Sequence, residues 1–157
     1  MAKFKLQPLI GTEADTVRLG VGSGAANYVT DLEQGKPVKL VGDSQYNLTA
    51  AGDQLEGFIN SVESFTADDF SIGGILTEGR VKVTLDGLQA TPGTGVIAVG
   101  DYVVAGTPVA KGTGLVGAYP KVCKDTTQTG MYFAWRVVSL DGTTAVGQTA
   151  PIARVNG

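Results

Sequence analysis

Short runs in which apolar and polar residues alternate, each closed by a glycine, constrain the fold of this chain more than any other feature. The clearest run is GRVKVTLDG, residues 79–87, where Val81, Val83 and Leu85 fall on one face and polar side chains fall on the other. A period of two residues is typical of a β-strand with one buried face. The run therefore predicts a strand whose apolar face packs on a core.

Similar patterns predict further strands elsewhere. They cover residues 15–22, 36–42, 98–112, 131–142 and 150–155. The segment 98–112 is expected to form a hairpin that turns at Gly106 and Thr107. Helix-forming residues gather only in 48–58 and 66–70, and both segments are short and polar. The sequence therefore favours strands and turns over helices.

Composition agrees with this interpretation. Glycine contributes 23 of the 157 residues, about twice its usual share, and charged residues make up only 17%. Short strands joined by glycine turns fit such a balance. We expect an all-β fold, a small barrel or sandwich with glycine-rich turns. An extended N-terminal arm is expected over residues 1–14 and a single β domain over residues 15–157.

A weak internal repeat suggests that this domain contains two similar lobes. In each half a Gly-x-x-Val strand comes first, a strand with small or aromatic residues follows, and a glycine-led strand with basic residues comes last. The repeat matches Gly35 with Gly100, Val38 with Val103, and Gly79 with Gly147. Two similar β lobes would fold together into one barrel or sandwich. Chance matching is the alternative, because glycine and valine are common in this chain.

Charge and residue counts exclude several classes of function. The net charge is −3 and the pI is about 4.8, which argues against a nucleic-acid partner. No apolar run approaches the length of a membrane span, and the first residues do not resemble a secretory signal. The chain has no histidine and one cysteine, so it has neither an internal disulfide nor the usual Ser-His-Asp or Cys-His catalytic set. We expect no catalytic residue, no cofactor and no metal.

Three glycines in RLGVGSGAANYV, residues 18–29, raise the question of a phosphate-binding loop. A dinucleotide fingerprint would need a third glycine where Ala25 stands, and a helix after it. The P-loop fails at Pro37, which follows Gly35 and Lys36, and the nucleophile elbow fails around Ser23. We therefore expect a permissive loop between strands.

Other candidate sites favour ordinary structural roles. Asp68 and Asp69, and Asp53 with Glu56, could pair for hydrolysis or metal binding, but acids in turns are usually solvated. Lys36 and Lys111 lie beside glycines as a carrier lysine would, yet they lack its apolar flanks, and we expect surface lysines. Cys123 has lysines nearby and no base partner, so a buried thiol without a catalytic role is expected.

The segment MYFAW, residues 131–135, is the main aromatic cluster. In a strand, Tyr132 and Ala134 would share one face, and Trp135 would lie on the other face with Met131 and Phe133. One face is expected in a core and the other at a subunit interface. Stacking on a sugar or a base is the alternative use of such a set.

The chain contains DLEQGKPVKLVG, then GFINSVES followed by GRVKVTLDG, then IAVGDYVVAG with the final ARVNG. These three features resemble the small β-rich capsid decoration, or cement, proteins of tailed bacteriophages. DLEQGKPVKLVG stands where those proteins have a Gly-x-Pro-Val strand, behind an N-terminal MAKF. GFINSVES followed by GRVKVTLDG resembles the next two strands, and IAVGDYVVAG with the final ARVNG resembles the later ones. The resemblance extends in order over about residues 15–157, and the insertions TADDFSIGGIL and YPKVCKDTTQTG are longer than in the family pattern.

The resemblance implies a structural protein of the virion exterior, made in the host cytoplasm. Such proteins assemble as trimers on the outside of the expanded shell and bridge neighbouring major capsid subunits. We therefore expect a homotrimer whose partner is the major capsid protein, with no enzymatic activity and no direct contact with nucleic acid or membrane. Contacts with the shell or with other subunits are expected at six residues: Lys3, Phe4, Lys5, Leu6, Tyr132 and Trp135.

Two other classes of function remain open. A carbohydrate-binding β module would use Tyr132 and Trp135 as stacking platforms. A nucleotide hydrolase built on a trimeric β fold is the third class, and the absence of histidine and of a complete phosphate motif argues against it.

Overall fold

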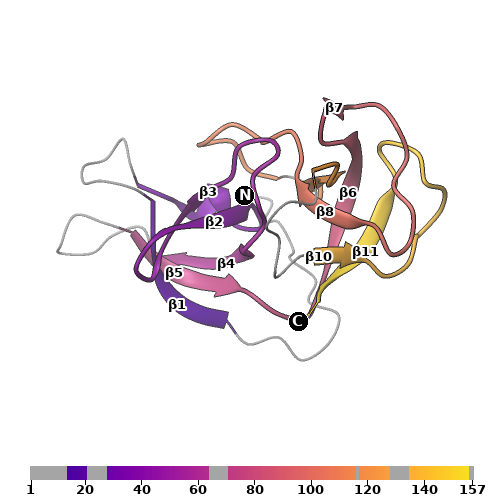
Figure 1. Ribbon diagram of the computed structural model, residues 1–157. Helices are drawn as coiled ribbons and strands as arrows, with labels where there is room; N and C mark the ends of the chain where they lie inside the picture. The colour runs from indigo at the N-terminus through magenta and orange to yellow at the C-terminus, as the bar shows by residue number, and fades with distance from the viewer. Residues whose placement is uncertain (1–13, 21–27, 64–70, 116, 128–134, 156–157) are drawn as a thin grey trace.

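The computed structural model describes residues 14–20, 28–63, 71–115, 117–127 and 135–155, and these form two β lobes side by side (Figure 1). The first lobe contains β1 (Ala14–Leu19), β2 (Pro37–Gly42), β3 (Gln45–Leu48), β4 (Gly57–Glu63) and β5 (Ser71–Leu76), with a 3-10 turn, η2 (Asp31–Glu33). The second lobe contains β6 (Arg80–Leu88), β7 (Thr91–Pro92), β8 (Tyr102–Ala105), β9 (Lys121–Lys124), β10 (Trp135–Val137) and β11 (Thr149–Arg154). The described residues include no α-helix, so the all-β prediction is confirmed.

The first lobe is a closed barrel in which the strands follow the order β1-β3-β2-β4-β5, and β5 pairs with β1. The second lobe has the order β11-β10-β8-β9-β6, with β7 added to β6, and a further pairing of β11 with β6 closes the circle. Among the strand pairs that the structure describes, only β1–β3 and β6–β9 are parallel. Each lobe is thus a ring of five strands with the same order and the same directions.

The register of the strands is also the same in the two lobes. Val38 stands opposite Leu48 in the first lobe. Three residue pairs of the second lobe match pairs of the first. Val103 stands opposite Lys124, Leu85 is beside Val122 as Leu19 is beside Tyr46, and Val137 faces Ile152 as Ile59 faces Ile75. One residue-to-residue match between the lobes therefore satisfies all five strand pairings, including the pairing that closes each ring.

Two glycines mark this equivalence in the backbone. Gly35 donates to Ile59 O over 2.7 Å, and Gly100 donates to Val137 O over 2.8 Å. Both glycines have positive φ, +86° and +91°, a conformation that other residues rarely adopt. The return bonds match as well, because the N–H of Ile59 and that of Val137 each donate over 3.0 Å to the residue after the glycine. The predicted matches of Gly35 with Gly100 and of Val38 with Val103 are confirmed.

The third predicted match, Gly79 with Gly147, is wrong. Gly79 precedes β6 and Gly147 precedes β11, but β6 is the counterpart of β1, and β11 is the counterpart of β5. The sequence pattern missed β5, since its stretch SIGGIL lacks the alternation of a half-buried strand. Without β5, the sequence pattern places β6 in the first half.

Other predicted elements had mixed outcomes. Val81, Val83 and Leu85 of β6 are buried as expected. β2 lies within its predicted segment, and β1 and β11 each begin one residue before theirs. The hairpin at Gly106 and Thr107 is wrong, because β8 pairs with β9 across a connection that spans 106–120. The segment 48–58 holds the end of β3 and the start of β4 rather than a helix. The other helix-forming segment, 66–70, lies outside the described residues.

Two hydrophobic clusters fill the lobes. The smaller lies inside the first barrel and includes Val17, Leu19, Val38, Ile59 and Ile75. The larger fills the second lobe and also takes in Leu55 and Phe58 from the first. Because the second core includes side chains of the first lobe, the two lobes are packed as one body. The predicted arm, residues 1–14, lies outside the described residues except for Ala14, where β1 begins.

Candidate functional site

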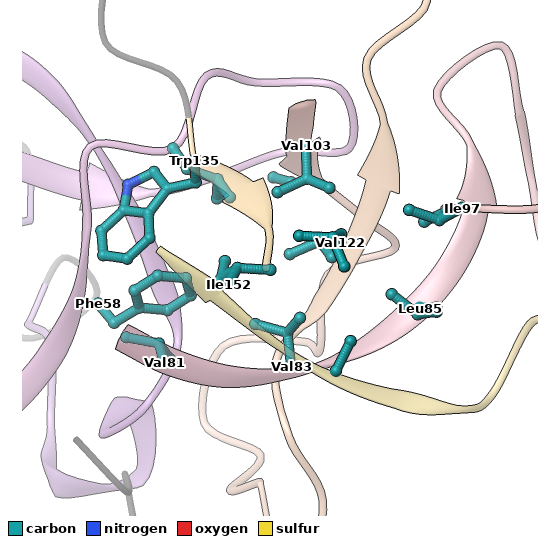
Figure 2. Packing of buried hydrophobic residues seen from close by; sticks show 13 residues of the cluster. Phe58, Val81, Val83, Leu85, Ile97, Val103, Val122, Trp135 and Ile152 are labelled. Carbon is teal, nitrogen blue, oxygen red and sulfur yellow. The ribbon is translucent and has the colours of Figure 1, made fainter. Parts of the chain in front are cut away.

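The contact between the lobes has an aromatic centre. Phe58 on β4 meets Trp135 on β10 edge to face, with ring centroids 5.3 Å apart and planes at 87°. Figure 2 shows the two rings together, with Val81 and Ile152 of the second lobe beside Phe58. Both aromatic side chains are completely buried. This arrangement stabilises the pair beyond its apolar burial, because the positive ring edge faces the negative ring face.

A buried ion pair fixes the 106–120 connection to the first lobe. Glu33 ends η2, and its carboxylate lies 3.5 Å from the Lys36 ammonium. Glu33 Oε1 also accepts from the N–H of Gly112 over 2.6 Å, and Lys36 Nζ donates to Ala110 O over 2.8 Å. Each member of the pair therefore holds one backbone group of the connection. The expectation of a surface lysine at position 36 is wrong, since Lys36 is only 3% exposed.

Hydrogen bonds determine the charge state of Glu33. Burial by itself raises the pKa of the Glu33 carboxyl, but donors from Gly112, from the N–H and hydroxyl of Thr30, and the charge of Lys36 outweigh it. The net result is a pKa below the ordinary value. The pKa of Lys36 is lowered chiefly by burial, against the opposing attraction of Glu33. The ion pair is therefore a structural clamp with satisfied partners.

A second buried carboxylate, Asp86 on β6, fixes the start of the same connection. Asp86 Oδ2 accepts from the N–H of Thr107 over 2.7 Å, and Oδ1 lies 3.7 Å from Lys121 Nζ. The Cys123 thiol donates to Asp86 O at 3.6 Å. Burial and the nearby Asp86 charge raise the pKa of Cys123 to about 11, against the opposing effect of Lys121. Cys123 is thus a buried thiol without nucleophilic character, as expected.

A shallow pocket lies where this connection meets the first lobe. Its lining includes Pro37 and Thr49 from the first lobe and Thr107, Pro108 and Leu115 from the second. The charged residues at its wall, Lys36 and Lys121, are each paired with a carboxylate described above. The pocket therefore presents no unpaired charge to a ligand.

The carboxylates considered for chemistry have structural partners. Asp53 pairs with Lys39 at 2.6 Å and accepts from the N–H of Ala50. Glu56 pairs with Arg154 across the lobe contact at 3.3 Å. Asp68 and Asp69 lie outside the described residues. Within the part of the chain that the structure describes, no group of histidine, cysteine or acidic residues could hold a metal ion.

Most of the predicted contact residues lie outside the described residues. These are Lys3, Phe4, Lys5, Leu6 and Tyr132. Trp135 is described, and its side chain is completely buried in the second core. It presents no surface for a partner or a sugar. The glycine loop at 21–27 is likewise outside the described residues, and Gly20 before it has a positive φ of +83°.

Exposed apolar side chains are the surface feature that the sequence pattern missed. Val96 and Val99 are exposed on the segment before β8, and Val146 is exposed on the segment before β11. The two segments are joined by a bond of 3.3 Å from Ile97 N–H to Thr144 O. We call Val96, Val99 and Val146 the second-lobe valines. Leu40 and Val41 are exposed on β2 of the first lobe.

Comparison with known proteins adds no family assignment. No protein-family model matches the sequence, and no curated protein matches it at a significant level. None of the helical segments in the described residues has the length and apolar character to cross a membrane.

Proposed function

We propose that this chain is a structural protein that binds the outer surface of a bacteriophage head and bridges major capsid subunits. It acts on the virion exterior as a homotrimer after synthesis in the host cytoplasm, and the proposal includes no catalytic step. The resemblance of three sequence segments to capsid decoration proteins supplies the identity of the partner. The geometry supports the mechanical part of the role.

The observation that carries the proposal is a body of two lobes packed through a shared core, with apolar side chains exposed on its surface. The aromatic pair and the Glu33–Lys36 clamp lock the lobes together, so a force on one lobe is transmitted to the other. The second-lobe valines expose apolar surface that a protein partner would cover. Two lobes packed as one body, with exposed apolar surface, are suited to bridging subunits of a shell.

Binding to shells tests the proposal. Expanded shells assembled from the major capsid protein of the phage that carries this chain are mixed with the purified protein and sedimented. Co-sedimentation at a fixed number of copies per shell is expected, and an unbound protein at micromolar concentration would contradict the proposal. Val99→Lys is expected to weaken binding about tenfold or more, since it places a charge in an apolar contact. Lys111→Glu, a charge change on the exposed connection, is the control.

The N-terminal arm is tested separately. The basic and apolar residues Lys3, Phe4, Lys5 and Leu6 suit docking of an extended segment on a groove, and three arms per trimer would multiply the affinity. Deletion of residues 1–10 is expected to abolish shell binding while the far-ultraviolet circular dichroism stays unchanged. Normal occupancy by the truncated protein would remove the arm from the proposal.

The burial of Trp135 argues against the carbohydrate-binding alternative. That alternative depended on Tyr132 together with Trp135, and the indole of Trp135 lies in the core against Phe58.

A further inference from the structure

In the second lobe, β8 pairs with β10 at Tyr102 and Val103, and beyond that pairing the same edge of β8 is covered by the first lobe. Gly52 donates to Ala105 O over 2.8 Å, and Ala105 N–H donates to Asp53 O over 2.9 Å. The segment that follows β3 therefore pairs with β8 as a short added strand. Ala105 is completely buried as a result.

The equivalent position in the first lobe is Leu40 on β2. Leu40 stands opposite Tyr46 as Ala105 stands opposite Val122, two residues after the matched valines Val38 and Val103. Leu40 is 53% exposed and Val41 is 42% exposed. The same strand position is thus covered in one lobe and open in the other.

The backbone at Leu40 is also in position to pair. Pro37 O accepts from Thr49 N–H on the β3 side, and hydrogen-bonded pairs alternate along an antiparallel ladder. The N–H and C=O of Leu40 therefore face away from β3. Pairing with β4 ends at Val38, so among the described residues no strand pairs with the outward side of β2 at Leu40.

The other half of the contact also has an open counterpart. Phe58 of β4 points into the second lobe within each chain, and Arg136 of β10 holds the equivalent position, since Pro37 faces Phe58 as Tyr102 faces Arg136. Phe58 is buried, whereas Arg136 is exposed. Within one chain, then, the first lobe covers the second, and Leu40 on β2 and Arg136 on β10 are the exposed residues at the matching positions. The counterparts of Gly52 and Asp53 in the second lobe lie outside the described residues.

We propose that a second copy of this chain covers the β2 edge at Leu40 and Val41. The second copy uses its second lobe, around Arg136, and this lobe sits on β2 as the first lobe sits on β8 within one chain. The contact is head to tail, so it joins two different surfaces and continues until the chains close into a ring. This inference rests on the self-association included in the proposed function, for which it names the interface. An arginine at this second contact makes it more polar than the apolar contact inside the chain.

A mixing experiment with two variants tests the interface. Leu40→Lys places a charge on the open edge, and an edge charge blocks strand addition. The same substitution leaves the second lobe intact. Arg136→Glu alters the second lobe and leaves the edge intact. By light scattering after gel filtration, wild type is expected as an oligomer, and each variant is expected to need about a tenfold or higher concentration to associate. Thr91→Lys, at an exposed strand residue of β7 that lies in neither proposed contact, is the matched control and should associate like wild type.

The equimolar mixture of the two variants gives the decisive result. The intact edge of Arg136→Glu can accept the intact second lobe of Leu40→Lys, so a dimer is expected that grows no further. A wild-type mass of one chain at 100 µM, about 16 kDa, would overturn the inference, as would Leu40→Lys with wild-type association or a mixture without dimer. Matching circular dichroism and thermal midpoints verify that both variants fold, as expected for exposed positions.

Shell sedimentation separates this result from the proposed function. A monomer that still binds shells would overturn the interface and the proposed trimer, and would leave shell binding standing. An oligomer with the predicted mixing behaviour that does not bind shells would contradict the shell proposal and leave the interface standing.

Discussion

Glu33 and Lys36 are charged residues that the fold buries almost completely, and their bonds reach a connection more than 70 residues away. Nothing in the sequence distinguishes Lys36 from a surface lysine, because the carbonyl that its ammonium binds belongs to Ala110, 74 residues further along the chain. The capping box of Thr30 and Glu33 is a local pattern, and it could have indicated the turn at η2. It could not have indicated that the same carboxylate binds Gly112.

Removal of one partner from this pair is expected to be costly. Glu33→Gln leaves a buried ammonium without its counter-charge, which typically destabilises by about 3–5 kcal/mol. The free energy of unfolding in urea measures the loss. Asp141→Asn breaks the Lys82–Asp141 pair at 2.9 Å, which is partly exposed, and about 0–1 kcal/mol is expected there. Equal losses in the two variants would contradict a structural role for the buried pair.

The pH dependence of stability follows from the lowered pKa of Glu33. The unfolded chain holds the proton more tightly than the native one, so the contribution of Glu33 is fully present above its ordinary pKa of 4.5. It is lost as the pH falls through the lower native value. The difference in unfolding free energy between wild type and Glu33→Gln is therefore expected to be constant from pH 7 to 5 and to shrink below pH 4.5. A difference that grows on acidification would show that the sign is wrong.

At the scale of elements, strands with one buried face were predictable and strands shaped by close backbone approach were not. β6 shows the alternation of its valines directly in the sequence. β5 is buried on both faces for most of its length and carries Gly73 and Gly74 where β4 comes close. Equivalent positions in the two halves of the repeat also differ in side-chain size, since Gly57 in the first lobe holds the position of Trp135 in the second. A comparison of residue types could not align two such positions.

Gly73 tests the close approach of β4 and β5. A Cβ at this position would lie 2.2 Å from Ser61 O and 2.7 Å from Leu19 Cδ1, so a backbone shift is needed to admit it. Gly73→Ala is expected to destabilise by about 3 kcal/mol, at the upper end for overpacking. Gly42→Ala, whose Cβ would meet only the flexible Gln45 side chain, is the control, with a change below about 1 kcal/mol. Thermal and urea midpoints measure both, and a tolerated Gly73→Ala would mean that the two strands lie farther apart.

At the scale of the whole molecule, the chain is one body made of two equivalent rings. The repeat was visible in the sequence only at Gly35, Gly100 and two valines, because register is conserved in space while side chains have diverged. The exposed edge at Leu40 could not be predicted at all, since its meaning comes from comparison with the covered edge at Ala105. The contact residues expected in the N-terminal arm remain predictions.

Coupling of the lobes predicts a single unfolding transition. Phe58 lies in the second core, and Arg154 donates to the backbone carbonyls of Glu56 and Thr77 on the first-lobe side. Fluorescence of Trp135, the one tryptophan, reports on the lobe contact, while circular dichroism reports on both rings. The two transitions are expected to coincide, with equal calorimetric and van't Hoff enthalpies. Separate midpoints would mean that the lobes unfold independently.

The central claim is that this two-barrel body reinforces a phage head from outside, and cryo-electron microscopy of expanded shells mixed with the purified protein tests it most directly. We expect density for two five-stranded barrels per chain on the outer surface, in groups of three, over the contacts between major capsid subunits. Shells that remain bare at a saturating protein concentration, or density confined to the inner surface, would contradict it.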